Sequence, residues 1–308
     1  MKPHSVTTFV IRGAVAAVLM CLVACRNMDV VSKVGTSIGV ATGTDTPGQA
    51  ESIQRSGEAI TKTFQDLTPE QVYYLGRAVG ATILNQYSPE ANDPATRYLN
   101  LVGQNLAQAS SRPDSFSGYY FSILDSDEIN AFAAPGGLIF VSRGMLNLCR
   151  NEDDVAAVLA HEIAHVAHQH GLMAIKKSRI TSALTTLAVE GAKSFGGENL
   201  AQLTEAFEGS IEDITSTMMN AGYTRELERD ADAEAIRILK TVGYDPSALV
   251  RLLRAMGPKL VSGRRDFATT HPPPADRIRE ISRFIPDSQP TFDLAARQSR
   301  FYEALIKK

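Results

Sequence analysis

The residues of this 308-residue chain that could carry out chemistry are concentrated in one stretch, His161-Glu162-Ile163-Ala164-His165. On a helix, two histidines four residues apart lie one turn above each other on the same face. Their imidazoles can then reach one zinc ion, and Glu162 can reach a water beside it. The pattern predicts a zinc-dependent hydrolase with His161 and His165 as metal ligands and Glu162 as general base.

The residues before and within this motif predict a buried helix. Asn151 can cap its start, and the three acids at 152–154 suit the positive end of the helix dipole. Apolar residues recur at helical spacing at Val155, Val158, Leu159, Ile163 and Val166. The alternative is a surface helix with two solvated histidines, but the stretch is too apolar for that. Buried histidine and glutamate side chains need a compensating partner, which a metal ion supplies.

The beginning of the chain resembles a lipoprotein signal rather than part of a fold. The apolar run 14–24 has the length of a signal-peptide core and is short for a membrane span. The sequence Leu22-Val23-Ala24-Cys25 resembles the bacterial lipoprotein cleavage box, in which Cys25 becomes the lipidated first residue. An ordinary secretory signal is the alternative. Because Arg26 and not Asp follows the cysteine, the same resemblance implies a lipid anchor in the outer membrane, facing the periplasm.

These features divide the chain into four parts. We expect a lipoprotein signal peptide over 1–24, the lipidated cysteine and a flexible tether over 25–66, a metallopeptidase domain over 67–285, and a C-terminal linker and helix over 286–308. Cys149 is then the one thiol left unmodified, and its apolar neighbours predict a buried side chain. The net charge of −3 and the lack of a basic run predict no binding of nucleic acid.

The hydrophobic periodicity predicts a mainly helical α+β fold. Helix starts are expected at Thr68-Pro69 and Asp93-Pro94. The period then changes to that of strands at 119–124, 129–132 and 138–142, which predicts a small sheet beside the H-E-x-x-H helix. The turn Pro135-Gly136-Gly137 can be a plain hairpin turn. The functional alternative is that one of these strands forms the rim of a cleft, where an extended peptide adds as another strand.

Two motifs together give a specific family resemblance. The segment Asn130–Val141, with the sequence NAFAAPGGLIFV, is followed closely by the H-E-x-x-H motif. This combination resembles the zinc metallopeptidase family of HtpX and the CAAX prenyl protease (metallopeptidase family forty-eight), and in kind its soluble periplasmic branch with BepA and LoiP. The resemblance spans about Thr68 to Arg283. It implies a gluzincin-type zinc metalloprotease domain with one Zn²⁺ per chain.

The family places its third zinc ligand, a glutamate, on a second helix downstream. The segment 223–232, YTRELERDAD, resembles the family signature R-x-x-E-x-x-A-D and puts Glu228 on the ligand position. Asp232 lies one turn further on the same face, where it could accept the free N–H of a ligating histidine. Spacing alone does not choose Glu228 over Glu226, Asp230 or Glu234.

Three further histidines are candidates for lesser roles. His271 lies in Thr270-His271-Pro272, which resembles the family's T-H-P segment, where a loop histidine can approach the metal. It is expected to stabilise the oxyanion, or to occupy the open zinc position as an inhibitory plug, and otherwise only to order the loop. We expect His168 to be solvated or structural, and His170 to suit the negative end of the motif helix.

Together these residues predict a membrane-anchored periplasmic zinc endopeptidase. Two imidazoles and one carboxylate leave an open zinc position, which is typical of catalytic sites. The expected substrates are unfolded or misfolded envelope proteins, bound along Gly137, Leu138, Ile139, Phe140 and Val141. The alternative is a chaperone-like binding factor for the outer-membrane assembly machinery, with proteolysis secondary or autoinhibited. A purely structural zinc protein is disfavoured because such a site has no use for Glu162.

Overall fold

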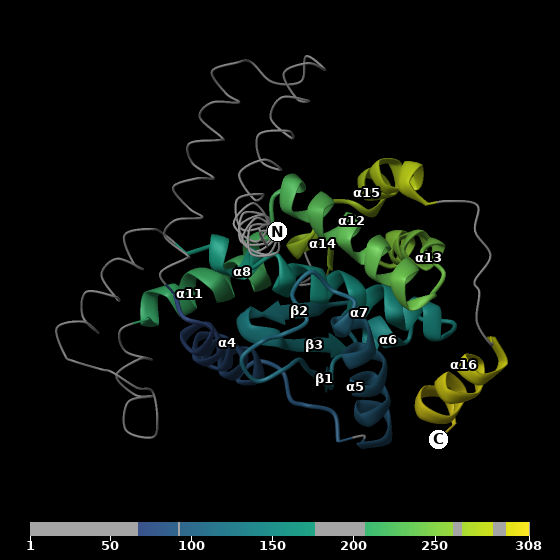
Figure 1. The fold of residues 1–308 in the computed structure, drawn as a ribbon, viewed down its shortest axis with the longest axis horizontal. Coiled ribbons are helices and arrows are strands. Elements are labelled where there is room, and N and C mark those ends of the chain that lie inside the picture. The colour runs from purple at the N-terminus through teal and green to yellow at the C-terminus, as the bar shows by residue number, and fades with distance from the viewer. Residues whose placement is uncertain (1–66, 92, 176–206, 261–266, 286–293, 308) are drawn as a thin grey trace, which may run out of the picture. The chain divides into compact units, whose positions relative to one another are not determined.

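The helix α7 (Glu152–Ala167) carries the H-E-x-x-H motif and is buried along its whole length (Figure 1). It belongs to a computed structural model of the chain that describes residues 67–91, 93–175, 207–260, 267–285 and 294–307. The predicted signal peptide, Cys25 and the tether lie outside the described residues. The described ranges belong to one unit that begins at Leu67.

The start of α7 has the predicted cap, and it also has ion pairs that the sequence pattern did not predict. The Asn151 side chain accepts a hydrogen bond from the backbone N–H of Asp154, which is the predicted cap. All three acids of the first turn are buried, and each pairs with an arginine from a later helix. The pairs are Glu152 with Arg300, Asp153 with Arg297, and Asp154 with Arg251. The segments that supply these arginines therefore hold the first turn of α7 in place.

Two helices precede the sheet, as predicted. The first, α4 (Pro69–Leu84), begins with a full capping box between Thr68 and Gln71. Such caps stabilise a helix by about 1 kcal/mol. The second, α5 (Asp93–Gln108), packs against the first strand and against α7. Gly80 of α4 lies against the side chains of Leu138 and Phe140, whereas Gly103 of α5 lies against Phe121. Because side chains alternate along a strand, α4 and α5 pack against opposite faces of the sheet.

The three strands form one small mixed sheet. They are β1 (Tyr120–Leu124), β2 (Ala131–Ala134) and β3 (Leu138–Ser142), in the order β1-β3-β2. β1 runs parallel to β3, and β2 runs antiparallel to it. The first and third strands match the prediction within one residue, whereas the middle strand begins two residues later than predicted. The turn 135–137 (η1) closes the hairpin between β2 and β3, with Gly136 at a φ of 76° that favours glycine.

The sheet order contradicts the prediction that β3 receives the substrate. β3 is the central strand, and it pairs along its length with β1 on one side and β2 on the other. A strand that is paired on both sides has no free edge to which a peptide can add. The correction applies to the predicted residues that lie in β3, Leu138, Ile139, Phe140 and Val141, whereas Gly137 lies in the turn before the strand and stays a prediction. Local periodicity identified the strand, but its place in the sheet depends on contacts with β1, which is distant in the sequence.

Helices make up most of the rest of the described chain, as the α+β prediction requires. In chain order they are α6 (Arg143–Leu146), α8 (His170–Met173), α11 (Glu208–Ser216), η2 (Thr217–Ala221), α12 (Arg225–Val242), α13 (Ser247–Met256), η3 (Gly257–Lys259), α14 (Phe267–Thr270), α15 (Pro274–Ile281), η4 (Ser282–Phe284), α16 (Leu294–Phe301) and η5 (Tyr302–Ile306). α12 packs along α7 and brings a second set of acids to it. Among the described residues, none of the helices is both long and apolar enough to cross a membrane.

Candidate metal centre

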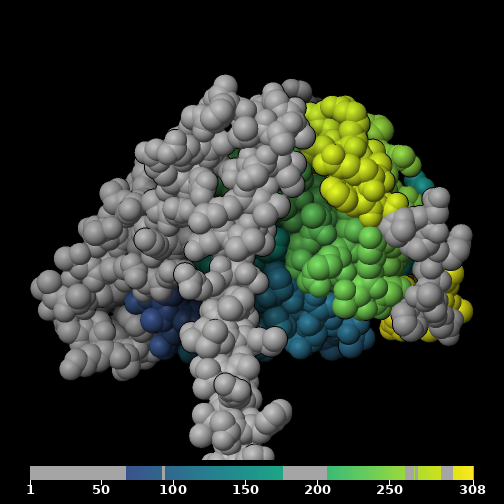
Figure 2. Space-filling view, turned by 45° about the horizontal axis from the view of Figure 1, so that its top comes forward, coloured from purple at the N-terminus to yellow at the C-terminus, as the bar shows by residue number. Residues whose placement is uncertain are grey.

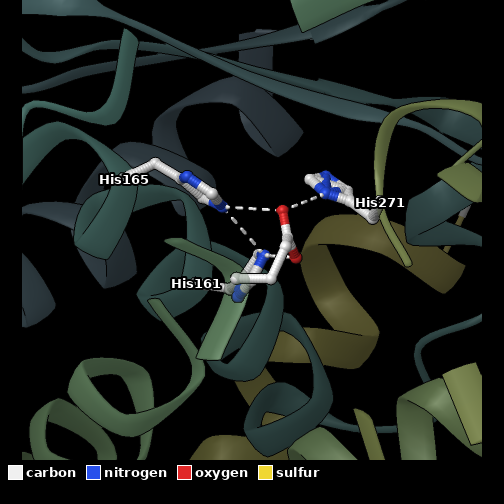
Figure 3. A group of neighbouring side chains, drawn as sticks. His161, His165 and His271 are labelled. Atoms are coloured by element: carbon white, nitrogen blue, oxygen red, sulfur yellow. Dashed lines mark hydrogen bonds and ion pairs between the residues drawn. The ribbon is translucent and has the colours of Figure 1, made fainter. Parts of the chain in front are cut away.

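Two helices bring three of the predicted ligands together in the interior. His161 and His165 project from one face of α7, with their Nε2 atoms 3.2 Å apart. α12 begins at a Thr224 cap and presents Glu228 to both imidazoles. Figure 3 shows the rings of His161, His165 and His271 turned toward one carboxylate, which the contacts identify as that of Glu228.

The separations within this group fit a zinc ion. The Glu228 carboxylate oxygens lie 3.6 Å from His161 Nε2 and 3.5 Å from His165 Nε2. Tetrahedral zinc binds nitrogen and oxygen at 2.0–2.2 Å, which places neighbouring donor atoms roughly 3.3 Å apart. His271 supplies a fourth donor atom, and all four lie within 4.8 Å of one another. The group could therefore hold one metal ion.

Unsatisfied polar atoms are concentrated in the same place. Among the described residues, five of the eight buried side-chain atoms without a hydrogen bond surround this group. They are Glu162 Oε1, Tyr223 Oη, Glu228 Oε2, His271 Nε2 and Arg277 Nη1. Buried polar groups almost always have hydrogen-bond partners, because a buried group without one costs about 1–3 kcal/mol of stability. A bound ion, its water and a substrate carbonyl would supply these partners.

Asp232 lies against the ligand that it was predicted to support. Its Oδ1 is 3.1 Å from His161 Nδ1, on the side of the ring that faces away from the metal group. The guanidinium of Arg277 also donates two hydrogen bonds to this carboxylate. Burial raises the pKa of Asp232, but Arg277 and His161 more than offset this and hold it well below its usual range. Asp232 is therefore a negatively charged group next to His161 Nδ1, and its role as acceptor of the His161 N–H stays a prediction.

Glu162 is buried beside the group with one carboxylate oxygen unpaired. Burial, and to a smaller degree the negative charge of Glu228, raise the pKa of Glu162 to about 7, against the opposing effects of His161 and Arg277. A carboxylate that titrates near neutral pH is well matched to both taking and returning a proton. The geometry thus places a suitable base next to the two histidines.

The structure separates Glu228 from the other acids of its segment. The side chains of Glu226 and Asp230 are exposed, and Glu234 is held away by Arg237 and by the backbone N–H of Ser111. Glu228 alone of these four acids reaches the histidines. Sequence spacing did not show which of the four acids is the ligand. The orientation of α12 against α7 decides this, because it turns Glu228 toward the histidines.

His271 enters the site from the loop between α14 and α15. Its Nδ1 is 3.0 Å from Glu228 Oε1, and its ring centre lies 5.4 Å from that of His161. Burial lowers the pKa of His271, although Glu228 opposes this, so the imidazole is neutral at pH 7. The structure therefore brings this loop histidine into the group, as the sequence suggested.

Three residues of the site were missed or misread from the sequence. His170 was expected at the end of the motif helix, but α7 ends at Ala167, and His170 instead begins α8 and contacts His165. Tyr223 stacks on the His165 ring at 4.4 Å, and Arg277 reaches Asp232 and Glu228. Tyr223 is the first residue of the segment 223–232, so that motif could have suggested it, whereas Arg277 lies five residues after Pro272 and outside both motifs.

A pocket of about 90 Å³ opens beside His165. A single water needs only about 10–15 Å³ by the same measure, so the pocket has room for a side chain of several atoms. Its wall combines the end of β2, the start of α4, and residues that follow the motif on α7 and α8. The apolar lining residues include Leu67, Val72, Ala133, Val166 and Leu172, and Arg112 and Asp114 add charge.

These features define a class of protein. Two histidines from an H-E-x-x-H helix, a glutamate from a second helix and an adjacent unpaired acid constitute a metallopeptidase-type site. The family model described as Peptidase family M48 matches residues 94–285. The chain belongs to peptidase family M48, and the predicted family is confirmed.

Several curated proteins are similar to most of the chain. The beta-barrel assembly-enhancing protease of Yersinia pestis is 29% identical over 239 residues, which cover 70% of this chain and 46% of that protein. The metalloprotease LoiP of Escherichia coli is 26% identical, with 86% and 92% covered. The mitochondrial metalloendopeptidase OMA1 of Schizosaccharomyces pombe is 28% identical, with 64% and 55% covered. The chain spans about half the length of the beta-barrel assembly-enhancing proteases that it matches.

Proposed function

We propose that this protein is a zinc-dependent endopeptidase. In this proposal His161, His165 and Glu228 hold one Zn²⁺, and Glu162 is the general base. The observation that carries the proposal is the clustering of buried polar atoms without a hydrogen bond around a set of donors with the spacing of zinc ligands. Membership of peptidase family M48 supports it independently.

The residues have distinct tasks in peptide hydrolysis. Bound zinc would supply Lewis acidity, which lowers the pKa of a water and polarises a substrate carbonyl. The unpaired oxygen of Glu162 takes the proton of the attacking water and later returns it to the leaving amine. Asp232 accepts the Nδ1–H of His161 and keeps the other nitrogen of that ring free for the metal. The buried site keeps bulk water away from these charges.

The free edge of the sheet, at β2 rather than β3, is the proposed site for the peptide backbone. Asn130 accepts a bond from the N–H of Ser142, so by alternation Phe132 and Ala134 also face β3, and Ala131 and Ala133 face outward. Among the described residues, no partner is found for either backbone group of Ala133. An extended peptide could pair there as an added strand.

The pocket beside His165 is the proposed site for a substrate side chain. Ala133 and His165 both line it, so it lies next to the free edge and to the metal group. Its lining is mainly apolar, with the charges of Arg112 and Asp114 added. We expect it to accept an apolar side chain, which unfolded proteins expose and folded proteins hide.

His271 is proposed to hold the site closed. His161, Glu162, His165, Glu228 and His271 are each no more than 6% exposed, so a peptide must displace part of the protein to reach them. Figure 2 shows the yellow surface of α15, the helix that follows the His271 loop, packed against the green surface of α13. As a fourth donor, His271 would fill the position that water and substrate need.

The test compares bound zinc and casein cleavage by the purified full-length protein and two variants. Glu162→Gln is expected to bind zinc like the wild type and to lose cleavage by a factor of about 100 or more. Cleavage that survives in Glu162→Gln, or a wild type without zinc, would show that the endopeptidase proposal is wrong. His271→Ala should cleave faster if His271 is a plug and more slowly if it stabilises the oxyanion.

We also propose that the protein is anchored through Cys25 in the outer membrane and acts on unfolded or misfolded envelope proteins in the periplasm. The lipoprotein-like start of the chain and the name of the Yersinia pestis relative support this. The alternative is a chaperone-like factor for the outer-membrane assembly machinery. Cys25→Ala should move the protein from the membrane to the soluble periplasmic fraction. An envelope function that survives in Glu162→Gln would instead favour the chaperone-like role.

A further inference from the structure

His170 touches a proposed ligand without being one. Its Nδ1 lies 3.0 Å from the Nδ1 of His165, and the two rings are nearly perpendicular, with centres 5.0 Å apart. The side chain is 1% exposed. The contact is on the side of the His165 ring that is opposite to Nε2, the atom that faces Glu228.

A hydrogen bond between two Nδ1 atoms needs one proton. Which of the two histidines donates that proton decides whether Nε2 of His165 can bind zinc. If His170 donates, the neutral His165 carries its own proton on Nε2, which then faces the metal group and cannot bind zinc. If His165 donates, its Nε2 has a free lone pair directed at the group. Only the second arrangement is compatible with His165 as a ligand.

We propose that His170 is a positioning residue, which accepts the Nδ1–H of His165 and so fixes the tautomer and the ring orientation that zinc binding requires. The inference rests on the proposed zinc site. It would give the two histidine ligands matching supports, because the Nδ1 of His161 lies 3.1 Å from Asp232 Oδ1 and is proposed to donate its proton there. Histidine ligands of metals commonly donate their second N–H in this way.

The backbone between the two histidines is shaped to make this contact. On a continuous helix, a residue five positions after His165 would point roughly 140° away from it. Instead α7 ends, and Gln169 adopts the left-handed conformation with φ 57° and ψ 31°. Among the described residues, Gln169 is the only one other than glycine with a positive φ. This turn starts α8 and returns the His170 ring to His165.

The zinc affinity of the full-length protein tests the proposal, measured by competition with a chromophoric chelator. His170→Leu keeps an apolar side chain of similar size but cannot accept, and we expect it to weaken zinc binding by about 10–100-fold. In His170→Asn the amide oxygen can accept in place of Nδ1, so binding should return to within a few-fold of the wild type. His168→Leu is the matched control and should bind like the wild type, since His168 is only partly buried.

The tautomer of His165 is a second readout. It would not change if His170 had only a structural role. Long-range ¹H–¹⁵N NMR spectra of the zinc-free protein should show His165 protonated on Nδ1 in the wild type and in His170→Asn. In His170→Leu this preference should be lost. Because the wild-type spectrum needs no variant, it tests the proposal even if His170→Leu does not fold.

The outcomes distinguish this proposal from the proposed function. An Nε2–H tautomer of His165 in the zinc-free wild type would overturn the role of His170. So would a folded His170→Leu with wild-type zinc affinity. Either result leaves the endopeptidase proposal intact if Glu162→Gln still abolishes cleavage. Absence of zinc from the wild type would reject the proposed function instead.

Discussion

At the scale of single residues, Arg277 is a buried cation that connects two parts of the metal centre. Its side chain is 3% exposed, donates two hydrogen bonds to Asp232, and has Nη1 3.5 Å from Glu228 Oε2. Arg277→Met leaves Asp232 buried with only His161 as a partner. Because removing one partner of a buried pair costs about 3–5 kcal/mol, we expect that loss in the unfolding free energy of the zinc-free protein, measured in urea.

A matched control lies two residues further on the same helix. Arg279 pairs with Asp276, but its side chain is 72% exposed. Exposed pairs contribute about 0–1 kcal/mol, so Arg279→Met should unfold nearly as the wild type does. Equal losses in the two variants would show that the Arg277 ion pairs are not what stabilises the site.

The sequence reveals the residues of the site unequally, for a physical reason. His161, Glu162 and His165 are set by helical periodicity, which is local, and the structure places them as predicted. Glu228 could be identified only through the family resemblance. Four acids of its segment are equivalent in the sequence, and the orientation of α12 against α7 distinguishes them. His170 could not be placed from periodicity, since its contact depends on the left-handed turn at Gln169.

At the scale of elements, the edge of β2 gives a test of substrate binding. The N–H of Ala133 faces away from β3, so proline at this position removes an outward donor and spares the ladder. We expect Ala133→Pro to raise the KM for casein at least several-fold with little change in the thermal midpoint. In Ala134→Pro the lost N–H faces β3, so the midpoint itself should fall. An unchanged KM in Ala133→Pro would exclude this edge as the substrate strand.

In the sheet, the positions of the strands could be predicted from the sequence, but their order could not. Alternation and turn residues located all three strands, with an error of two residues at the middle one. The order β1-β3-β2 was not predicted, because a parallel pair such as β1 and β3 joins strands that a hairpin does not connect. The mistaken choice of β3 as the substrate strand follows directly from that missing information.

The start of α13 should make stability depend on pH. Asp245 accepts hydrogen bonds from the N–H and hydroxyl of Ser247 and from Arg251. Burial raises the pKa of Asp245, but these bonds outweigh it and lower the pKa below 3.8. Since the folded protein then holds its proton less tightly than the unfolded chain, the stabilisation is present above about pH 3.8 and is lost as the pH falls further.

We therefore expect Asp245→Asn to lower the unfolding free energy by about 1 kcal/mol at pH 7, which is typical of one intramolecular hydrogen bond. Near pH 3 the gap between the wild type and the variant should be smaller than at pH 7, because the unfolded chain then binds a proton at this position more tightly than the folded protein does. Urea unfolding at the two pH values measures this difference. A gap that stays constant between them would contradict an electrostatic origin.

At the scale of the whole molecule, the C-terminal helix α16 belongs to the same unit as the metal centre, although the family match ends at residue 285. Arg297 is buried, donates to Asp153 and to the Gly243 carbonyl, and lies 4.1 Å above the Tyr244 ring. Arg300 pairs with Glu152, which is fully buried. α16 thus neutralises two acids in the first turn of the helix that carries both histidines.

Removal of residues 286–308 should therefore damage the metal centre from a distance. It leaves Glu152 and Asp153 buried without their arginines, and a buried charge without its partner costs several kcal/mol. We expect the shortened protein to lose several kcal/mol of unfolding free energy and to bind zinc more weakly. Arg297→Met should reproduce part of this loss, whereas Lys307→Met, which removes an exposed pair with Glu303, should not. If the shortened protein keeps wild-type zinc affinity and stability, the start of α7 does not depend on α16, and residues 67–285 suffice for the site.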